Sequence, residues 1–170
     1  MAAESVFSQF GIKVKNIEKD YPEIQADTSS EIAKQMAIEA AKEFNVPVMR
    51  EDHSIGLDVM NGMPGPFMAW FDKKIPVERL LEILKHEKNR KGHFELALAY
   101  AKPNGAVKEF SYKIPFVLSI EAKGSRGNWN KSIIIDEKTG KTIGETEEKE
   151  NVDVWNKNYY SLAKEIMNEE

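Results

Sequence analysis

Hydrophobic residues recur at helical spacing along several parts of the chain. One apolar face every three to four residues is typical of an amphipathic helix packed on a core. The clearest case begins at Thr28, where Thr28 and Glu31 are spaced as a capping-box pair. Pro76 is suited to the first turn of another helix. The pattern predicts helices over residues 2–10, 28–44, 76–85 and 152–168.

Alternating apolar and polar residues predict the strands. A Lys-Pro-Asn-Gly turn at 102–105 separates two alternating segments, which is typical of a β-hairpin. The stretch at 47–49 is short and apolar, and it ends at the acids Glu51 and Asp52. The expected strands cover residues 11–17, 47–49, 93–101, 110–114, 116–122 and 132–136. Helices that precede a hairpin-rich middle favour one α/β domain over 1–170 with a mixed sheet.

Composition and charge narrow the class of protein. The 170 residues are 41% hydrophobic and 31% charged, which is ordinary for a globular domain. The net charge of -4 provides no general basic field for a nucleic acid polymer or an acidic membrane surface. A site for polyanionic phosphates would therefore need a local source of positive charge, such as a metal ion.

Cysteine content and hydropathy bear on the location of the protein. The chain has no cysteine, which excludes disulfides and thiolate metal sites and fits a cytoplasmic protein. No stretch approaches the roughly 18 apolar residues of a membrane span. The first residues lack the basic start and apolar run of a signal peptide. We therefore expect a cytoplasmic protein that does not enter a membrane.

The acids at 51 and 52 are the first candidates for chemistry. They follow a buried strand and precede a Gly/Pro turn, and α/β sheets place ligands at the carboxyl ends of strands. The competing interpretation is a solvated loop, which is the usual environment of an Arg-Glu-Asp run. His53 beside them is either a phosphate contact or a surface histidine.

Four short motifs occur in order within about fifty residues. They are Asp20–Gln25 (DYPEIQ), Thr28–Ala33 (TSSEIA), Pro47–Asp52 (PVMRED) and Gly62–Pro66 (GMPGP). Their order and spacing resemble the inosine/xanthosine triphosphate pyrophosphatase family, which has a Pro-Glu-x-Gln loop, a Glu-Ile-Ala helix, two acids after a strand, and a Gly-x-Pro-Gly turn. Weaker matches follow over residues 126–149.

The resemblance implies a fold and an activity. Members have an elongated α/β fold with a mixed β-sheet flanked by helices, in two lobes with a central cleft, and usually form homodimers. They hydrolyse deaminated purine nucleoside triphosphates, such as inosine or xanthosine triphosphate, to the monophosphate and pyrophosphate with Mg²⁺. We therefore expect a nucleoside triphosphate substrate and a homodimer.

The resemblance also implies roles for individual residues. Glu23 and Asp52 would hold the Mg²⁺, which prefers oxygen ligands, and Glu51 would be the acid or base that orients water. Residues implied to bind the nucleotide are Pro64, Gly65, Trp129, Asn130 and Lys149. From the residues alone, Glu23 would more often be a surface acid of a loop than a ligand, and the glycine-proline segment is most simply a turn. A tryptophan packed against the sheet is the alternative to one stacked on a purine.

The chain departs from the family pattern in two places. It begins inside the first helix, without the strand and the Thr-x-Asn-x-x-Lys loop that hold the triphosphate. A start placed too late, a loss of phosphate binding, or a partner that supplies the strand would each explain this. Asn130 replaces an aspartate that reads the base, and Asp153-Val-Trp155 replaces Ser-His-Arg. The alternative is that the chain is a catalytically weak or inactive member of the family, which binds a nucleotide or a partner chain. A substrate with a different base is also consistent with these replacements.

Overall fold

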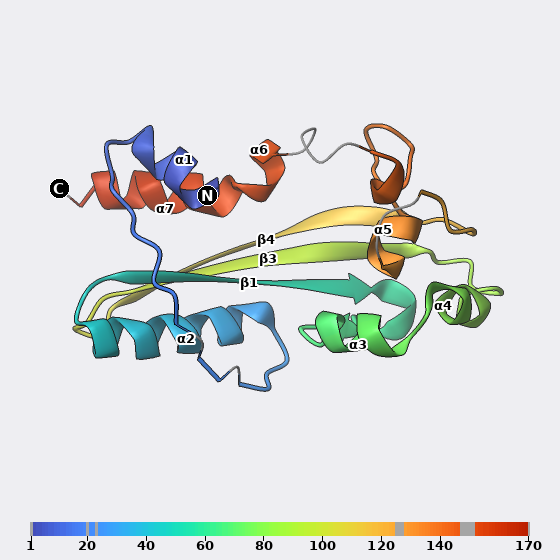
Figure 1. Ribbon diagram of the computed structural model, residues 1–170, viewed down its shortest axis with the longest axis horizontal. Helices are drawn as coiled ribbons and strands as arrows, with labels where there is room; N and C mark the ends of the chain where they lie inside the picture. The colour runs from blue at the N-terminus through green and yellow to red at the C-terminus, as the bar shows by residue number, and fades with distance from the viewer. Residues whose placement is uncertain (1, 20, 23, 125–127, 147–151, 170) are drawn as a thin grey trace. The chain divides into compact units, whose positions relative to one another are not determined.

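The computed structural model describes residues 2–19, 21–22, 24–124, 128–146 and 152–169. Its strands form one sheet in the order β2-β1-β3-β4-β5 (Figure 1). The strands are β1 (Val48–Leu57), β2 (Pro64–Gly65), β3 (Lys91–Ala101), β4 (Val107–Leu118) and β5 (Ile134–Ile135). The helices are α1 (Ala2–Ser8), α2 (Ser29–Phe44), α3 (Met68–Lys74), α4 (Val77–Ile83), α5 (Trp129–Ile133), α6 (Val152–Trp155) and α7 (Lys157–Met167), with 3₁₀ turns η1 (Asp58–Met60) and η2 (Ile143–Glu145).

This architecture confirms the expected α/β class. The sheet of the described residues is antiparallel, and β2 and β5 extend it by short pairings with β1 and β4. The chain divides into two compact units: unit 1 comprises 1–52, 96–112 and 151–170, and unit 2 comprises 53–95 and 113–150. The three long strands contribute residues to both units. Among the described residues, no helix has the length and apolar character needed to span a bilayer.

Helix α2 covers one face of the sheet in unit 1 (Figure 1). Small side chains allow α2 to lie close to the sheet, because the alanines of α2 pack against alanines of β3 and against Val48 of β1. The predicted capping box is confirmed: Glu31 N donates to Thr28 Oγ1 at 3.3 Å, and Thr28 N donates to Glu31 Oε2 at 3.1 Å. These two bonds satisfy backbone groups that the first turn of a helix leaves without partners.

The opposite face of the sheet in unit 1 is covered by α1 and α7. Phe7 of α1, Leu98 of β3 and Leu162 of α7 form the centre of this cluster and are almost completely buried. Lys108 of β4 also pairs with Glu165 of α7 at 2.5 Å. The closing helix is therefore fixed to the sheet by apolar burial, with ion pairs at its exposed edge.

Unit 2 has its own apolar core. It is built from Ile55 and Leu57 of β1, Leu80 of α4 and Trp129 of α5, among other residues. Arg90 links the end of α4 to the end of β4. Its guanidinium donates to the carbonyl oxygens of Leu84, Leu118 and Ser119 at 2.9, 3.0 and 2.5 Å. Burial lowers the pKa of Arg90, but the three acceptors keep its donors satisfied.

Several expected element boundaries were wrong. Residues 12–19 form no strand, and Ile12 and Val14 pack instead on the cluster under α1 and α7. The strand expected over 47–49 continues to Leu57, because apolar residues resume after the acids. The expected strand over 116–122 ends at Leu118, and the one over 132–136 is reduced to β5. The helices α3 and α5 were not predicted, and the closing helix is interrupted at the buried Asn156.

Candidate active site

Glu51 lies within β1, on the face that α7 covers. The hydroxyl group of Tyr159 donates a hydrogen bond to Glu51 Oε2. Burial of the phenol, and then this bond, raise the pKa of Tyr159, so the hydroxyl stays protonated and remains a donor. Glu51 is half-buried. Its carboxylate is held on one side by the neutral phenol of Tyr159.

The backbone around Tyr159 is anchored to the sheet. The buried Asn158 donates from Nδ2 to the carbonyl oxygen of Leu96 in β3 at 2.9 Å. The Tyr159 ring meets Phe7 edge-on, with ring centroids 6.1 Å apart. These contacts place the phenol from two neighbouring elements, so its direction toward Glu51 follows from packing as well as from the hydrogen bond.

A second tyrosine and a lysine complete the surroundings of Glu51. Lys157 Nζ lies 4.9 Å from the centroid of the Tyr112 ring, which is cation–π geometry. Burial, and then the charge of Glu51, raise the pKa of Tyr112. The carboxylate thus lies near two half-buried tyrosines, Tyr112 and Tyr159, and partial burial of this kind lowers the local dielectric constant.

Asp52 belongs to the other face of β1. Val48 packs with the alanines of α2, and Arg50 Nη2 lies 4.0 Å from Met36 Sδ of that helix. Because side chains alternate along a strand, Asp52 shares this face with Val48 and Arg50. Its Oδ2 atom is buried. The sequence placed both acids after the strand, whereas the structure puts them inside it, on opposite faces.

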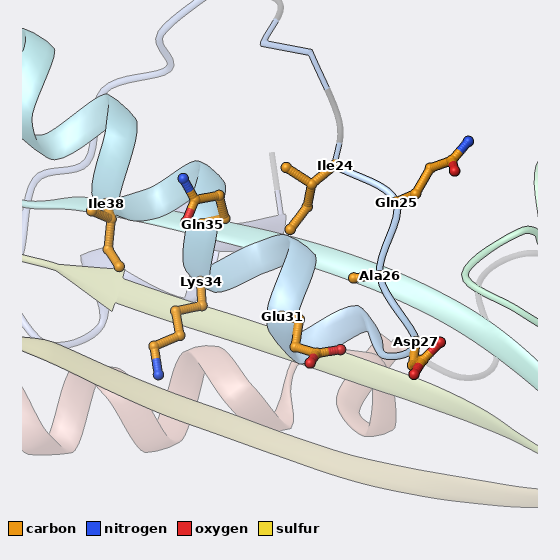
Figure 2. A pocket seen from close by; sticks show the side chains of 8 residues that line it. All are labelled: Ile24, Gln25, Ala26, Asp27, Glu31, Lys34, Gln35 and Ile38. Atoms are coloured by element: carbon orange, nitrogen blue, oxygen red, sulfur yellow. The ribbon is translucent and has the colours of Figure 1, made fainter.

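The expected metal pair is only partly described. Glu23 lies outside the described residues, so its convergence with Asp52 remains a prediction. The residues that follow it, Ile24 to Asp27, run beside α2 (Figure 2). Among the described residues, no three His, Cys, Asp or Glu side chains are grouped as a metal cage.

A surface pocket of about 520 Å³ lies between this loop and α2 (Figure 2). Its lining residues are Ile24, Gln25, Ala26, Asp27, Glu31, Lys34, Gln35 and Ile38. Three of the polar groups already have partners, since Glu31 caps the helix, Lys34 pairs with Glu109 at 2.7 Å, and Gln35 donates to Glu39 at 2.6 Å. Neither Glu51 nor Asp52 lines this pocket.

The Gly/Pro turn belongs to unit 2. Pro64 and Gly65 form β2 and pair with Gly56 and Ile55 of β1. Pro64 follows a cis peptide bond and is buried, and Gly65 has a φ of 59°, which a glycine adopts without strain. The structure therefore assigns the segment the turn that its sequence indicated, while contact with a nucleotide remains a prediction.

Trp129 is a core residue and is not available to stack on a base in this structure. Its side chain is 2% exposed and meets Phe71 edge-on, with centroids 5.9 Å apart. The alternative of a packed tryptophan is therefore the one that the structure favours. Asn130 follows it in α5 and is half-buried, and its role in binding stays a prediction. Lys149 lies outside the described residues.

The sequence interpretation missed Tyr159, although a signal was present. Tyr159, Leu162, Ala163 and Ile166 follow the helical spacing of a buried face. A tyrosine within such a face brings a hydroxyl group that needs an acceptor when it is buried. Pairing that requirement with the acids of the short strand would have pointed to Glu51.

Comparison with known proteins gives matches over most of the chain. A family model described as the Ham1 family matches residues 2–164. A dITP/XTP pyrophosphatase of Methanopyrus kandleri is 34% identical over 143 residues, covering 84% of this chain and 76% of that protein. A dITP/XTP pyrophosphatase of Thermococcus kodakarensis is 33% identical over 152 residues, covering 88% and 82% of the two chains.

Solved structures agree at the level of the fold. The Ham1 protein of Staphylococcus aureus superposes with a TM-score of 0.76 at 21% identity, covering 90% of this chain and 83% of that one. A HAM1 protein of Coxiella burnetii gives a TM-score of 0.74 at 19% identity, covering 95% and 84%. At such identities, the likeness establishes a shared architecture.

Proposed function

Because the chain belongs to the Ham1 family, we propose that it hydrolyses a nucleoside triphosphate to the monophosphate and pyrophosphate with Mg²⁺. The names of its relatives favour a deaminated purine, since those proteins are dITP/XTP pyrophosphatases. The observation that carries the proposal within this chain is a pair of adjacent acids, Glu51 and Asp52, in a strand of unit 1. The half-buried Tyr159 donates a hydrogen bond to Glu51, and Asp52 has a buried carboxylate oxygen.

The donor chemistry fits magnesium. Mg²⁺ takes oxygen ligands, retains waters, and is commonly bound by one or two carboxylates together with substrate phosphates. The absence of a three-ligand cage among the described residues agrees with that mode of binding. We propose Asp52 and Glu23 as the protein ligands. When bound, the ion would neutralise phosphate charge and lower the pKa of water.

The proposed reaction is an in-line displacement at the α-phosphorus. The oxygen of a water molecule forms a bond to that phosphorus while the bond to the bridging oxygen of the β-phosphate breaks, and pyrophosphate leaves. We assign Glu51 as the base that accepts the proton of the attacking water. Tyr159 engages Oε2 of the half-buried Glu51, which restricts the orientation of the carboxylate. Proton transfer to the other oxygen, Oε1, requires that water reach this buried atom.

Substitution of Glu51 tests the assignment. Glu51→Gln keeps the shape of the side chain and removes the base, so pyrophosphate release should fall by about 100-fold or more, the range for loss of general base catalysis. Glu78→Gln is the matched control, because Glu78 is an exposed acid of α4 in unit 2. Thermal melts establish that both variants are folded. Full activity of Glu51→Gln would reject the role assigned to Glu51.

A further inference from the structure

The hydrogen bond between Tyr159 and Glu51 joins residues that are 108 positions apart in the sequence. It is formed between a buried helix face and a strand that carries the apolar Met49 and, by alternation, His53 on the same face as Glu51. A hydrogen bond to a carboxylate is stronger and more directional than one between neutral groups. The bond therefore restricts the rotamer of Glu51 from the side of α7.

The phenol is a rigid donor because the protein holds it independently of Glu51. Asn158 ties the start of α7 to the Leu96 carbonyl, and Phe7 contacts the Tyr159 ring. Leu162 and Ala163, one turn later on the same face, are fully buried. Removal of the hydroxyl group alone would leave these packing contacts in place, so the effect of the bond can be separated from the effect of the ring.

We propose that Tyr159 is the positioning residue for Glu51 and acts on catalysis only through that carboxylate. This inference rests on the proposed function. In this scheme the Tyr159 hydroxyl group sets the orientation in which the carboxylate accepts the proton of the attacking water. Tyr159 itself transfers no proton in this scheme. The ring of Tyr112, with Lys157 over its face, lies close enough for the charge of Glu51 to raise the pKa of Tyr112, and we assign Tyr112 no role in positioning the carboxylate.

A kinetic double-mutant cycle tests the proposal. Tyr159→Phe removes the hydroxyl group and keeps the ring, and it should lower kcat about tenfold with KM unchanged within about twofold, because only orientation at the reacting centre is lost. Glu51→Asp withdraws the carboxylate from the phenol by one methylene group. In that background, Tyr159→Phe should change kcat by less than about twofold, since the two residues act as a unit.

Tyr160→Phe provides the matched control on the same helix. The Tyr160 hydroxyl accepts a long hydrogen bond from Gln9 Nε2, at 3.4 Å, so the variant should retain the activity of the wild-type protein. Single-turnover measurements with enzyme in excess extend the range for the slow variants. Losses from Tyr159→Phe and Glu51→Asp that multiply in the double variant would overturn the proposal while the proposed function stands. A folded wild-type protein that releases no pyrophosphate would overturn the proposed function and this inference together.

Discussion

Individual residues divide into those that the fold requires and those available for chemistry. Glu51 is half-buried and bonded to Tyr159, whereas Trp129 lies in the core of unit 2 with Phe71. The resemblance to the family selected both residues, but it cannot separate a core residue from a ligand-binding one, because the sequence motif does not report burial. Burial separates them: a side chain that is 2% exposed contributes packing energy and presents no face to a ligand.

Trp129 is expected to be a determinant of stability. Trp129→Ala leaves a large cavity beside Phe71 and should lower the free energy of unfolding by about 3–5 kcal/mol, measured by denaturant titration. Trp70→Ala is the matched control, because Trp70 is 62% exposed, and its effect should stay within about 0.5 kcal/mol. Equal losses in the two variants would show that Trp129 is not part of the core.

At the level of elements, the sequence was most informative where a local rule decides the structure. The capping box at Thr28 and the helical spacing after it located α2, and the turn at 102–105 located the hairpin of β3 and β4. Alternation was less reliable over 11–17, because a strand also needs a partner edge, and pairing is a property of the tertiary structure. The same limit applies to β1, whose length beyond the acids depends on pairing with β3 and β2.

The start of α2 offers a direct test of this local rule. Thr28→Ala removes the side chain that accepts from Glu31 N and should lower the free energy of unfolding by about 1 kcal/mol, measured in guanidinium chloride. Ser30→Ala, two residues into the same helix, is the control and should change stability by less than about 0.5 kcal/mol. No difference between the two variants would argue against a stabilising capping box.

For the molecule as a whole, the sequence predicted the family correctly but did not predict the geometry of the site. Four short motifs carried the resemblance, and the match to the Ham1 family over residues 2–164 confirms it. Adjacent residues of a strand always point to opposite faces, but the sequence could not reveal that β1 continues past the two acids to Leu57, since that depends on pairing with β3 and β2. The roles of Glu23 and Lys149 remain predictions of the resemblance, because both lie outside the described residues.

The most direct test of the account is to identify the phosphorus-containing products formed from inosine and xanthosine triphosphate by ³¹P NMR, with Mg²⁺ and after its removal by a chelator. We predict one monophosphate and one pyrophosphate per substrate in the presence of Mg²⁺, and loss of turnover when the ion is removed. Formation of the diphosphate and orthophosphate would place the cleaved bond elsewhere and contradict the proposed attack at the α-phosphorus. Absence of turnover by the folded protein with every nucleoside triphosphate tested would contradict the assigned activity itself.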